Sequence, residues 1–233
     1  MTSGWIVLHK PPGISSAQAL RPLQRTLPKN IKIGHGGTLD PLADGVLVIA
    51  LGEATKLVHL ALKGEKSYIL EVTWGQERTT DDQEGDVLFS NDFRPTKKQI
   101  LEALTHFTGH IQQVPPVYSA IKKNGKRLCD LARSGEVVVP EPRTVEIISF
   151  DLCEILKDNT AQFLIRCGGG TYMRSIARDM GRFLGTYGYA SRITRTSVGP
   201  FCLDQSIPWD RYEDACTRGS WSDLLYSVTK GLD

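Results

Sequence analysis

The sequence lacks an apolar run long enough to cross a membrane, because its most apolar stretch, residues 46–51, has only the length of a strand. Its N-terminus lacks the basic segment and long apolar core of a secretion signal. Five cysteines are an odd number without paired short spacing, which favours reduced thiols over a zinc site or a disulfide framework. We therefore expect a cytoplasmic protein with no membrane segment.

The chain also lacks a large excess of charge, with 28 lysines and arginines against 26 acidic residues. Basic residues nevertheless gather in two segments, residues 121–135 and 166–195, each of which contains one acid. Acidic residues dominate residues 77–86. The two basic segments predict a surface that binds a polyanion, but acids that lie close in space would neutralise them equally well. Charge alone leaves both interpretations open.

The pattern of apolar residues predicts strands and helices in irregular alternation. A length of 233 residues allows one large domain or two small ones. Irregular alternation favours an α+β fold over a repeating βαβ sheet. We expect strands at 5–8, 45–52, 68–74, 143–150 and 162–167, helices at about 15–23, 53–62, 96–107 and 171–185, and a loop at 34–37. Thr171 is the expected N-cap of the last helix and Gly185 its end.

Residues 34–45, Gly-His-Gly-Gly-Thr-Leu-Asp-Pro-Leu-Ala-Asp-Gly, form the most informative segment. Its glycines let a partner approach the backbone closely, and Pro41 biases Asp40 away from helical geometry. A carboxylate on such a loop can serve as a nucleophile or base. An Asp-Pro pair taken alone is more often a turn whose aspartate bonds its own backbone. A phosphate-binding P-loop is excluded because the Gly-Lys-Ser/Thr ending is absent.

This loop resembles the catalytic signature of the TruB family of tRNA pseudouridine synthases. Six further segments resemble family motifs in the same order, at residues 8–11, 52–56, 66–68, 115–135, 167–174 and 193–199. The resemblance implies the pseudouridine-synthase fold, a long, mixed, mostly antiparallel sheet with flanking helices and a thumb-like insertion. We expect one catalytic domain over residues 1–233, with the thumb at 114–140, a C-terminal helical segment at 208–233 and no complete PUA domain.

The resemblance also assigns three catalytic residues. Pseudouridine forms when the C1′–N1 bond of uridine breaks, the base turns and C1′ bonds C5. Asp40 is the implied nucleophile, by attack on the sugar or on the base, and stabilisation of an oxocarbenium-like state is the open alternative. Tyr68 is expected to stack on the flipped uracil, and packing of this tyrosine in a strand is compatible with that role. Arg174 is expected to pair with Asp40 and to keep it ionised.

The remaining implied contacts are with RNA. His35 would fill the space left by the flipped base. Asp82 falls on an acidic family position, although residues 77–86 also fit a solvated loop, and Ile193 either lines the pocket or packs in a strand. Basic thumb residues would bind phosphates. The predicted RNA-binding residues are Lys10, His35, Asp82, Lys122, Lys126, Arg133, Tyr172 and Ile193. The sequence departs from the family at His9, Thr79 and Ser191, where Asp, Asp and His are usual.

The implied substrate is the uridine at position 55 in the T-loop of tRNA. We expect a monomer that binds the tRNA T-arm, with no obligate protein partner. No metal or organic cofactor is implied, because the reaction needs neither redox chemistry nor an activated water. Two alternatives stay open: a synthase of another RNA specificity, such as the guide-RNA-dependent relatives, and a non-catalytic tRNA-folding chaperone. The thumb, poor in apolar anchors, is expected to be mobile until RNA binds.

Overall fold

The computed structural model describes residues 3–123, 125–156 and 159–231, with the side chains of 61–63, 122, 123 and 230 left out. The chain divides into two compact units, Met1–Tyr68 with Thr194–Asp233, and Ile69–Ile193. It passes from the first unit to the second within strand β4 (Lys66–Trp74) and returns within β12 (Gly188–Val198). None of its described helices is long and apolar enough to cross a membrane.

The first unit is built on β3 (Asp44–Leu51), which is buried at every position except the first. β1 (Gly4–Lys10) pairs with it antiparallel from Gly4↔Leu51 to Lys10↔Gly45, and the end of β12 pairs with its start in parallel. The remaining strands are β2 (Ile33–Gly36), which pairs with β3, and β13 (Phe201–Cys202), which pairs with β12. The near-continuous apolar run of β3 is what a strand buried on both faces requires.

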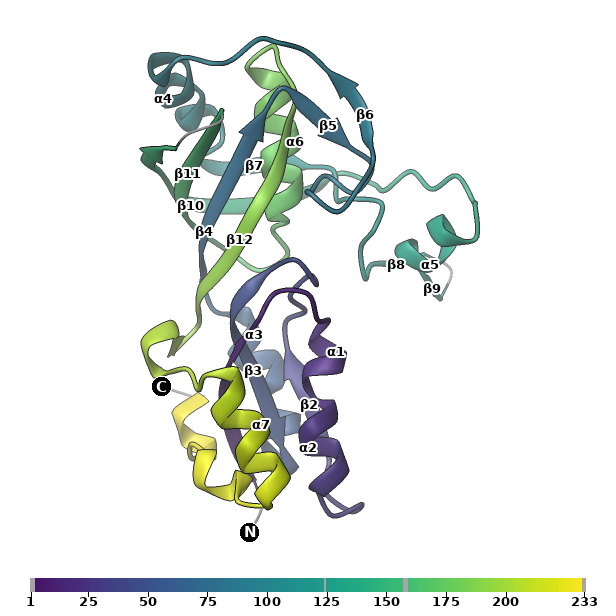
Figure 1. The fold of residues 1–233 in the computed structure, drawn as a ribbon, viewed down its shortest axis with the longest axis vertical. Coiled ribbons are helices and arrows are strands. Elements are labelled where there is room, and N and C mark those ends of the chain that lie inside the picture. The colour runs from purple at the N-terminus through teal and green to yellow at the C-terminus, as the bar shows by residue number, and fades with distance from the viewer. Residues whose placement is uncertain (1–2, 124, 157–158, 232–233) are drawn as a thin grey trace. The chain divides into compact units, whose positions relative to one another are not determined.

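Short helices complete the first unit (Figure 1). They are α1 (Ser16–Ala19), α2 (Arg21–Thr26), α3 (Val58–Lys63) and α7 (Trp209–Arg218), with 3₁₀ turns η1 (Gly52–Lys56), η2 (Leu203–Gln205), η3 (Trp221–Leu224) and η4 (Val228–Gly231). The Tyr212 hydroxyl, on α7, donates to the carbonyl of Ala19 at 3.0 Å and so joins α7 to α1. Trp5 and Phe201 pack in the core beside Val46 and Val48.

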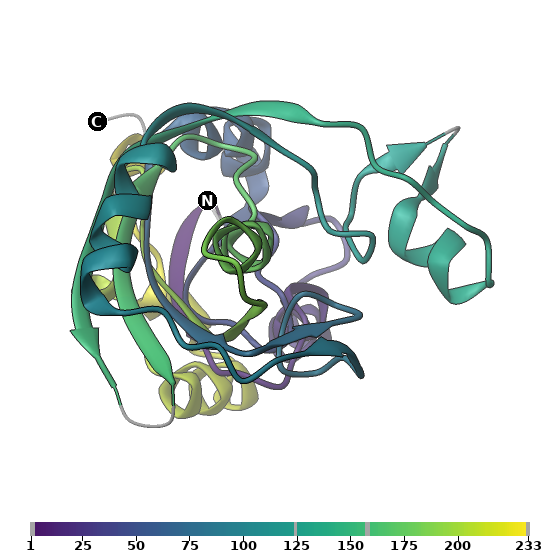
Figure 2. The ribbon, with the colours of Figure 1, turned by 90° about the horizontal axis from the view of Figure 1, so that it is seen from above.

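The second unit contains a sheet in the order β12-β4-β11-β10-β7. Its other strands are β11 (Thr160–Cys167), β10 (Arg143–Ile155) and β7 (Gly109–Gln113), and a hairpin is formed by β5 (Gln76–Arg78) and β6 (Val87–Ser90). β10 pairs antiparallel with both β11 and β7. The helices are α4 (Lys97–His106) and α6 (Met173–Phe183), and α6 is seen end-on inside the curved sheet in Figure 2.

The predicted thumb contains two short strands and one helix. They are β8 (Lys122–Lys123), β9 (Lys126–Arg127) and α5 (Leu128–Arg133). Two extended segments carry this hairpin and helix outward from the rest of the second unit (Figures 1 and 2). Asn124, predicted to form the turn with Gly125, lies outside the described residues.

The structure corrects three local predictions. The loop expected at 34–37 is largely strand, because Gly34 and His35 pair with Ala50 and Ile49 of β3. The helix expected at 15–23 is two short helices, since Pro22 at the start of α2 has no N–H to continue α1. Thr171 does not cap α6: its hydroxyl donates to the carbonyl of Gly168 at 3.1 Å. The alternating burial of β4 and the α+β architecture are confirmed.

Candidate active site

Asp40 lies on the loop between β2 and β3, in the first unit, and is half-buried. The N–H of Ala43 donates to the Asp40 carbonyl at 3.1 Å, which closes a turn after the carboxylate. A proline follows Asp40 directly, so the backbone of this turn has little freedom. The chain therefore presents the Asp40 carboxylate on a stiff turn ahead of a strand that is buried at every position but its first.

The turn at residues 10–14 holds the backbone of Pro41, which follows Asp40. The N–H of Gly13 donates to the carbonyl of Pro41 at 2.7 Å. Lys10 has no exposed surface, and its ammonium donates to the carbonyls of Pro11 and Ile14 at 2.8 Å each and of Pro41 at 3.4 Å. An ammonium enclosed in this way holds the Asp40 loop. The predicted contact of Lys10 with RNA stays a prediction.

Arg195, on β12, holds both ends of the same loop. Its guanidinium donates from Nε to the carbonyl of Val46 at 2.9 Å and from Nη2 to the carbonyl of Gly37 at 3.0 Å. The side chain is only 1% exposed. The backbone of Arg195 runs so close to Gly45 that any side chain there would collide with it. This arginine belongs to the basic segment at 166–195, and the structure shows it as an internal support of the loop.

His35, on β2, is half-buried next to this support. Burial lowers the pKa of its imidazole below the ordinary value of 6.5, and the nearby positive charge of Arg195 lowers it further. The ring is therefore neutral at pH 7. Its Nδ1 atom is enclosed without a hydrogen-bond partner among the residues that the structure describes. A neutral ring of this kind can stack on a base, and its contact with RNA stays a prediction.

Tyr68 and Ile193 are both buried residues of strands. Tyr68 is 7% exposed and lies on the buried face of β4, whereas Ile193 is 3% exposed on β12. Strand packing explains both positions. Their predicted parts in the reaction, stacking on uracil and lining its pocket, stay predictions.

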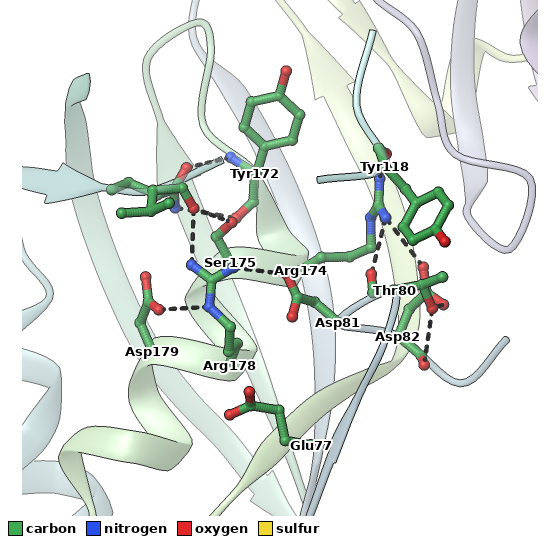
Figure 3. A network of polar contacts seen from close by, with 12 residues as sticks. Glu77, Thr80, Asp81, Asp82, Tyr118, Tyr172, Arg174, Ser175, Arg178 and Asp179 are labelled. Atoms are coloured by element: carbon green, nitrogen blue, oxygen red, sulfur yellow. Dashed lines mark hydrogen bonds and ion pairs between the residues drawn. The ribbon is translucent and has the colours of Figure 1, made fainter. Parts of the chain in front are cut away.

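Arg174 lies in the first turn of α6 and is almost fully buried in the second unit (Figure 3). It donates to the carbonyl of Thr80 at 3.0 Å and to the carbonyl of Tyr118 at 2.9 Å, and it pairs with the Asp82 carboxylate at 3.4 Å. Asp82 also accepts from the Thr80 hydroxyl at 2.5 Å. Asp82 is thus part of a buried network rather than of a solvated loop. The predicted pair of Arg174 with Asp40 stays a prediction.

Arg178 and Asp81 form a second buried ion pair, one turn along α6. Arg178 donates to Asp81 at 2.7 Å and to the carbonyl of Val114, where the thumb segment begins, at 2.8 Å. Burial raises the pKa of Asp81 to about 6, against the opposing effect of Arg178. Sequence reasoning missed this pair, although arginines at 174, 178 and 182 share one face of the helix. Arg182 continues the row with two hydrogen bonds to Glu77.

These contacts change the meaning of the basic segment at 166–195. Three of its six arginines, 174, 178 and 195, are buried in internal contacts, so they do not form a surface for a polyanion. The basic residues that do face solvent in the thumb include Lys126 and Arg133. The side chain of Lys122 lies outside the described part of the structure. The thumb therefore remains the better candidate for phosphate contacts.

Tyr172 precedes α6 and is half-buried. The side-chain amide of Gln113 fixes its backbone: Gln113 accepts from the Tyr172 N–H at 2.8 Å and donates to its carbonyl at 3.1 Å. This pair joins the end of β7 to the start of α6, close to the entry of the thumb. The predicted contact of the Tyr172 ring with RNA stays a prediction.

Comparison with known sequences identifies a family. A family model described as TruB family pseudouridylate synthase (N terminal domain) matches residues 24–173. The tRNA pseudouridine synthase B of Bradyrhizobium diazoefficiens is 50% identical over 235 residues, covering 99% of this chain and 68% of that protein. The protein of the same name from Rhodopseudomonas palustris is 48% identical and is covered to 64%. The chain thus spans about two thirds of the length of these relatives.

Comparison with solved structures agrees with the fold. A chain of a Cbf5-Nop10-Gar1 complex superposes with a TM-score of 0.71 at 27% identity, over 98% of this chain and 61% of that chain. A chain of an H/ACA RNP bound to a substrate RNA containing 2′-deoxyuridine gives a TM-score of 0.69 at 25% identity, over 98% and 60%. The α+β fold expected from the sequence is shared with both.

Proposed function

We propose that this chain, which belongs to the TruB family of pseudouridylate synthases, isomerises uridine to pseudouridine at position 55 in the T-loop of tRNA. The observation that carries the proposal is the Asp40 turn, whose neighbours Gly37 and Pro41 are held by buried groups from two other segments. The relatives named above, called tRNA pseudouridine synthase B, support tRNA as the substrate.

The reaction asks one carboxylate to act at the glycosidic bond. The C1′–N1 bond breaks, the uracil turns, C1′ bonds C5, and the proton that leaves C5 is balanced by one gained at N1. In these steps an ionised Asp40 acts as a nucleophile toward the sugar or the base, or stabilises positive charge on the sugar. Either task needs the carboxylate to be fixed relative to the ring, because misplacement by about 1 Å can cost about 10²-fold in rate.

Two further side chains complete the proposed chemistry. Tyr68 stacks on the flipped uracil, for which an aromatic ring with a polar tip is suited. Arg174 pairs with Asp40 and keeps it ionised. The network of Thr80, Tyr118 and Asp82 around Arg174 fixes its guanidinium and so would orient any carboxylate that meets it.

The target uridine is buried in folded RNA and has to be extruded before it reacts. The neutral imidazole of His35 fills the space that the base leaves. Exposed Lys126 and Arg133 of the thumb bind phosphates of the T-arm. The sequence predicts the same role for Lys122. The reaction as written requires no metal ion or organic cofactor.

The test is to incubate the purified chain with an unmodified tRNA transcript and to map pseudouridine along it. We expect modification at position 55, and no product in a matched transcript that carries cytidine there. Product at another uridine would contradict the proposed position of modification and support the proposed reaction. Absence of pseudouridine from every transcript would contradict the proposed activity.

A further inference from the structure

Ser16 contacts the Asp40 loop although it lies on a different segment. Its hydroxyl donates to the carbonyl of Leu39 at 3.0 Å and accepts from the N–H of Leu39 at 2.8 Å, across a sequence separation of 23 residues. Ser16 is 1% exposed and Leu39 is 3% exposed. The backbone N–H and carbonyl of Leu39, which precedes Asp40, are therefore both hydrogen-bonded to one buried hydroxyl.

Leu39 needs such a partner because it lies outside the strands. β2 ends at Gly36 and β3 begins at Asp44, so no strand ladder supplies hydrogen bonds between them. A buried backbone N–H or carbonyl left without a partner is strongly unfavourable, and water does not easily reach those of Leu39. The hydroxyl of Ser16 takes the place of a neighbouring strand and fixes the orientation of the Leu39 peptide groups.

The neighbouring serine has a different and purely local task. Ser15 is the N-cap of α1: its side chain accepts from the N–H of Gln18 at 3.2 Å, and the Gln18 side chain accepts from the Ser15 N–H at 2.8 Å. α1 thus begins with two serines, of which the first caps the helix and the second holds the loop. This difference makes Ser15 a matched control.

We propose that Ser16 is a positioning residue for Asp40, a role that rests on the proposed function of the chain. Ser16 fixes Leu39 before the carboxylate, Gly13 and Lys10 fix Pro41 after it, and Arg195 fixes Gly37 at the loop's start. Among these groups Ser16 is the one side chain whose two hydrogen bonds both end on the residue next to Asp40. It acts through the backbone, and no contact of its own with RNA is required.

The experiment compares Ser16→Ala with Ser15→Ala on a tRNA transcript. We expect the single-turnover rate constant of pseudouridine formation to fall about 10- to 100-fold in Ser16→Ala, as a small displacement of the carboxylate would produce. Its dissociation constant for tRNA should stay unchanged. Ser15→Ala should keep the wild-type rate, although it loses the cap. Ser16→Thr, which keeps the hydroxyl, should recover most of the rate.

Folding is checked by circular dichroism and thermal melting of each variant. If Ser16→Ala does not fold, Ser16→Cys makes the same test at nearly constant volume, because a thiol is a weak donor and a weak acceptor. A folded Ser16→Ala or Ser16→Cys with the wild-type rate overturns the proposal, as does an equal loss in Ser15→Ala. Wild-type protein that forms no pseudouridine overturns the proposed function and this role together.

Discussion

Gly45 and Arg195 approach each other so closely that a Cβ atom on Gly45 would overlap the carbonyl oxygen of Arg195. Gly45 also has a φ of +102°, which side chains disfavour. The two residues are partners in the parallel pairing of β12 with β3. The strand that follows the Asp40 loop and the strand that carries its supporting arginine therefore meet at a glycine.

Replacing this glycine tests the contact. We expect Gly45→Ala to lower the free energy of unfolding by about 2–4 kcal/mol, because both the backbone conformation and the space are unfavourable. Gly34→Ala is the matched control, since its Cβ would meet nothing within 4 Å and its φ is not positive. Urea unfolding of both variants measures the difference. Equal stability of the two would show that the close approach is not maintained in solution.

The ion pair of Asp81 with Arg178 predicts a dependence of stability on pH. Burial raises the pKa of Asp81 from 3.8 to about 6, so the folded protein holds this proton more tightly than the unfolded chain does. Its contribution to stability is therefore present below pH 3.8 and is lost as the pH rises toward 6. Integrated over this interval, the loss is on the order of 3 kcal/mol.

Asp81→Asn should remove this dependence. We expect the stability of the wild type relative to Asp81→Asn to decrease as the pH rises from 4 to 7. Urea unfolding of both proteins at several pH values gives the comparison. Parallel curves would show that the pairing with Arg178 cancels the effect of burial, and a relative stability that increases with pH would show that it outweighs burial.

The thumb predicts a binding step that is sensitive to salt. Each phosphate contact that is lost should reduce the slope of log affinity against log salt concentration by about one unit. We expect Lys126→Gln to show this smaller slope and to keep its catalytic rate on bound tRNA. Lys98→Gln is the control, because Lys98 is a lysine of α4 whose side chain is 85% exposed. An equal change in both variants would show a general effect of charge instead of a thumb contact.

Hydrogen exchange tests whether the thumb orders on RNA. The segment at 114–140 has exposed Val137 and Val139 and few buried apolar side chains, of which Leu128 is one. We expect slower exchange across it when tRNA is added, because bound phosphates offset the entropy cost of ordering. Strong protection with and without tRNA would identify the segment as a rigid part of the protein.

Local patterns predicted the elements whose form depends on nearby residues. β4 alternates between buried and half-buried positions as its sequence indicates. In α6 the apolar residues Met173, Ile176, Ala177 and Met180 are buried, whereas Phe183 at its end is exposed. β2 was missed because its strand conformation depends on pairing with β3, which no short window reveals. Glycines at 34 and 36 read locally as a loop, and only the distant partner makes them a strand.

The same distinction applies to the residues of the candidate site. The resemblance singled out Asp40 by its loop. Ser16 and Arg195, which hold that loop, carry no local signal because their partners lie far away in the sequence. The arginines of α6 were counted in a basic segment for the same reason, because their partners also lie far away in the sequence. A sequence lists charges but does not show which carbonyls and carboxylates enclose them.

The most direct test of the catalytic role of Asp40 is the single-turnover rate of pseudouridine formation at position 55 by Asp40→Asn, measured beside its affinity for the same tRNA. Asparagine keeps the shape of the side chain but cannot act as an ionised nucleophile. We predict a rate reduced by at least about 10³-fold with unchanged tRNA affinity. A folded Asp40→Asn protein that modifies this uridine at the wild-type rate would contradict the catalytic role of Asp40.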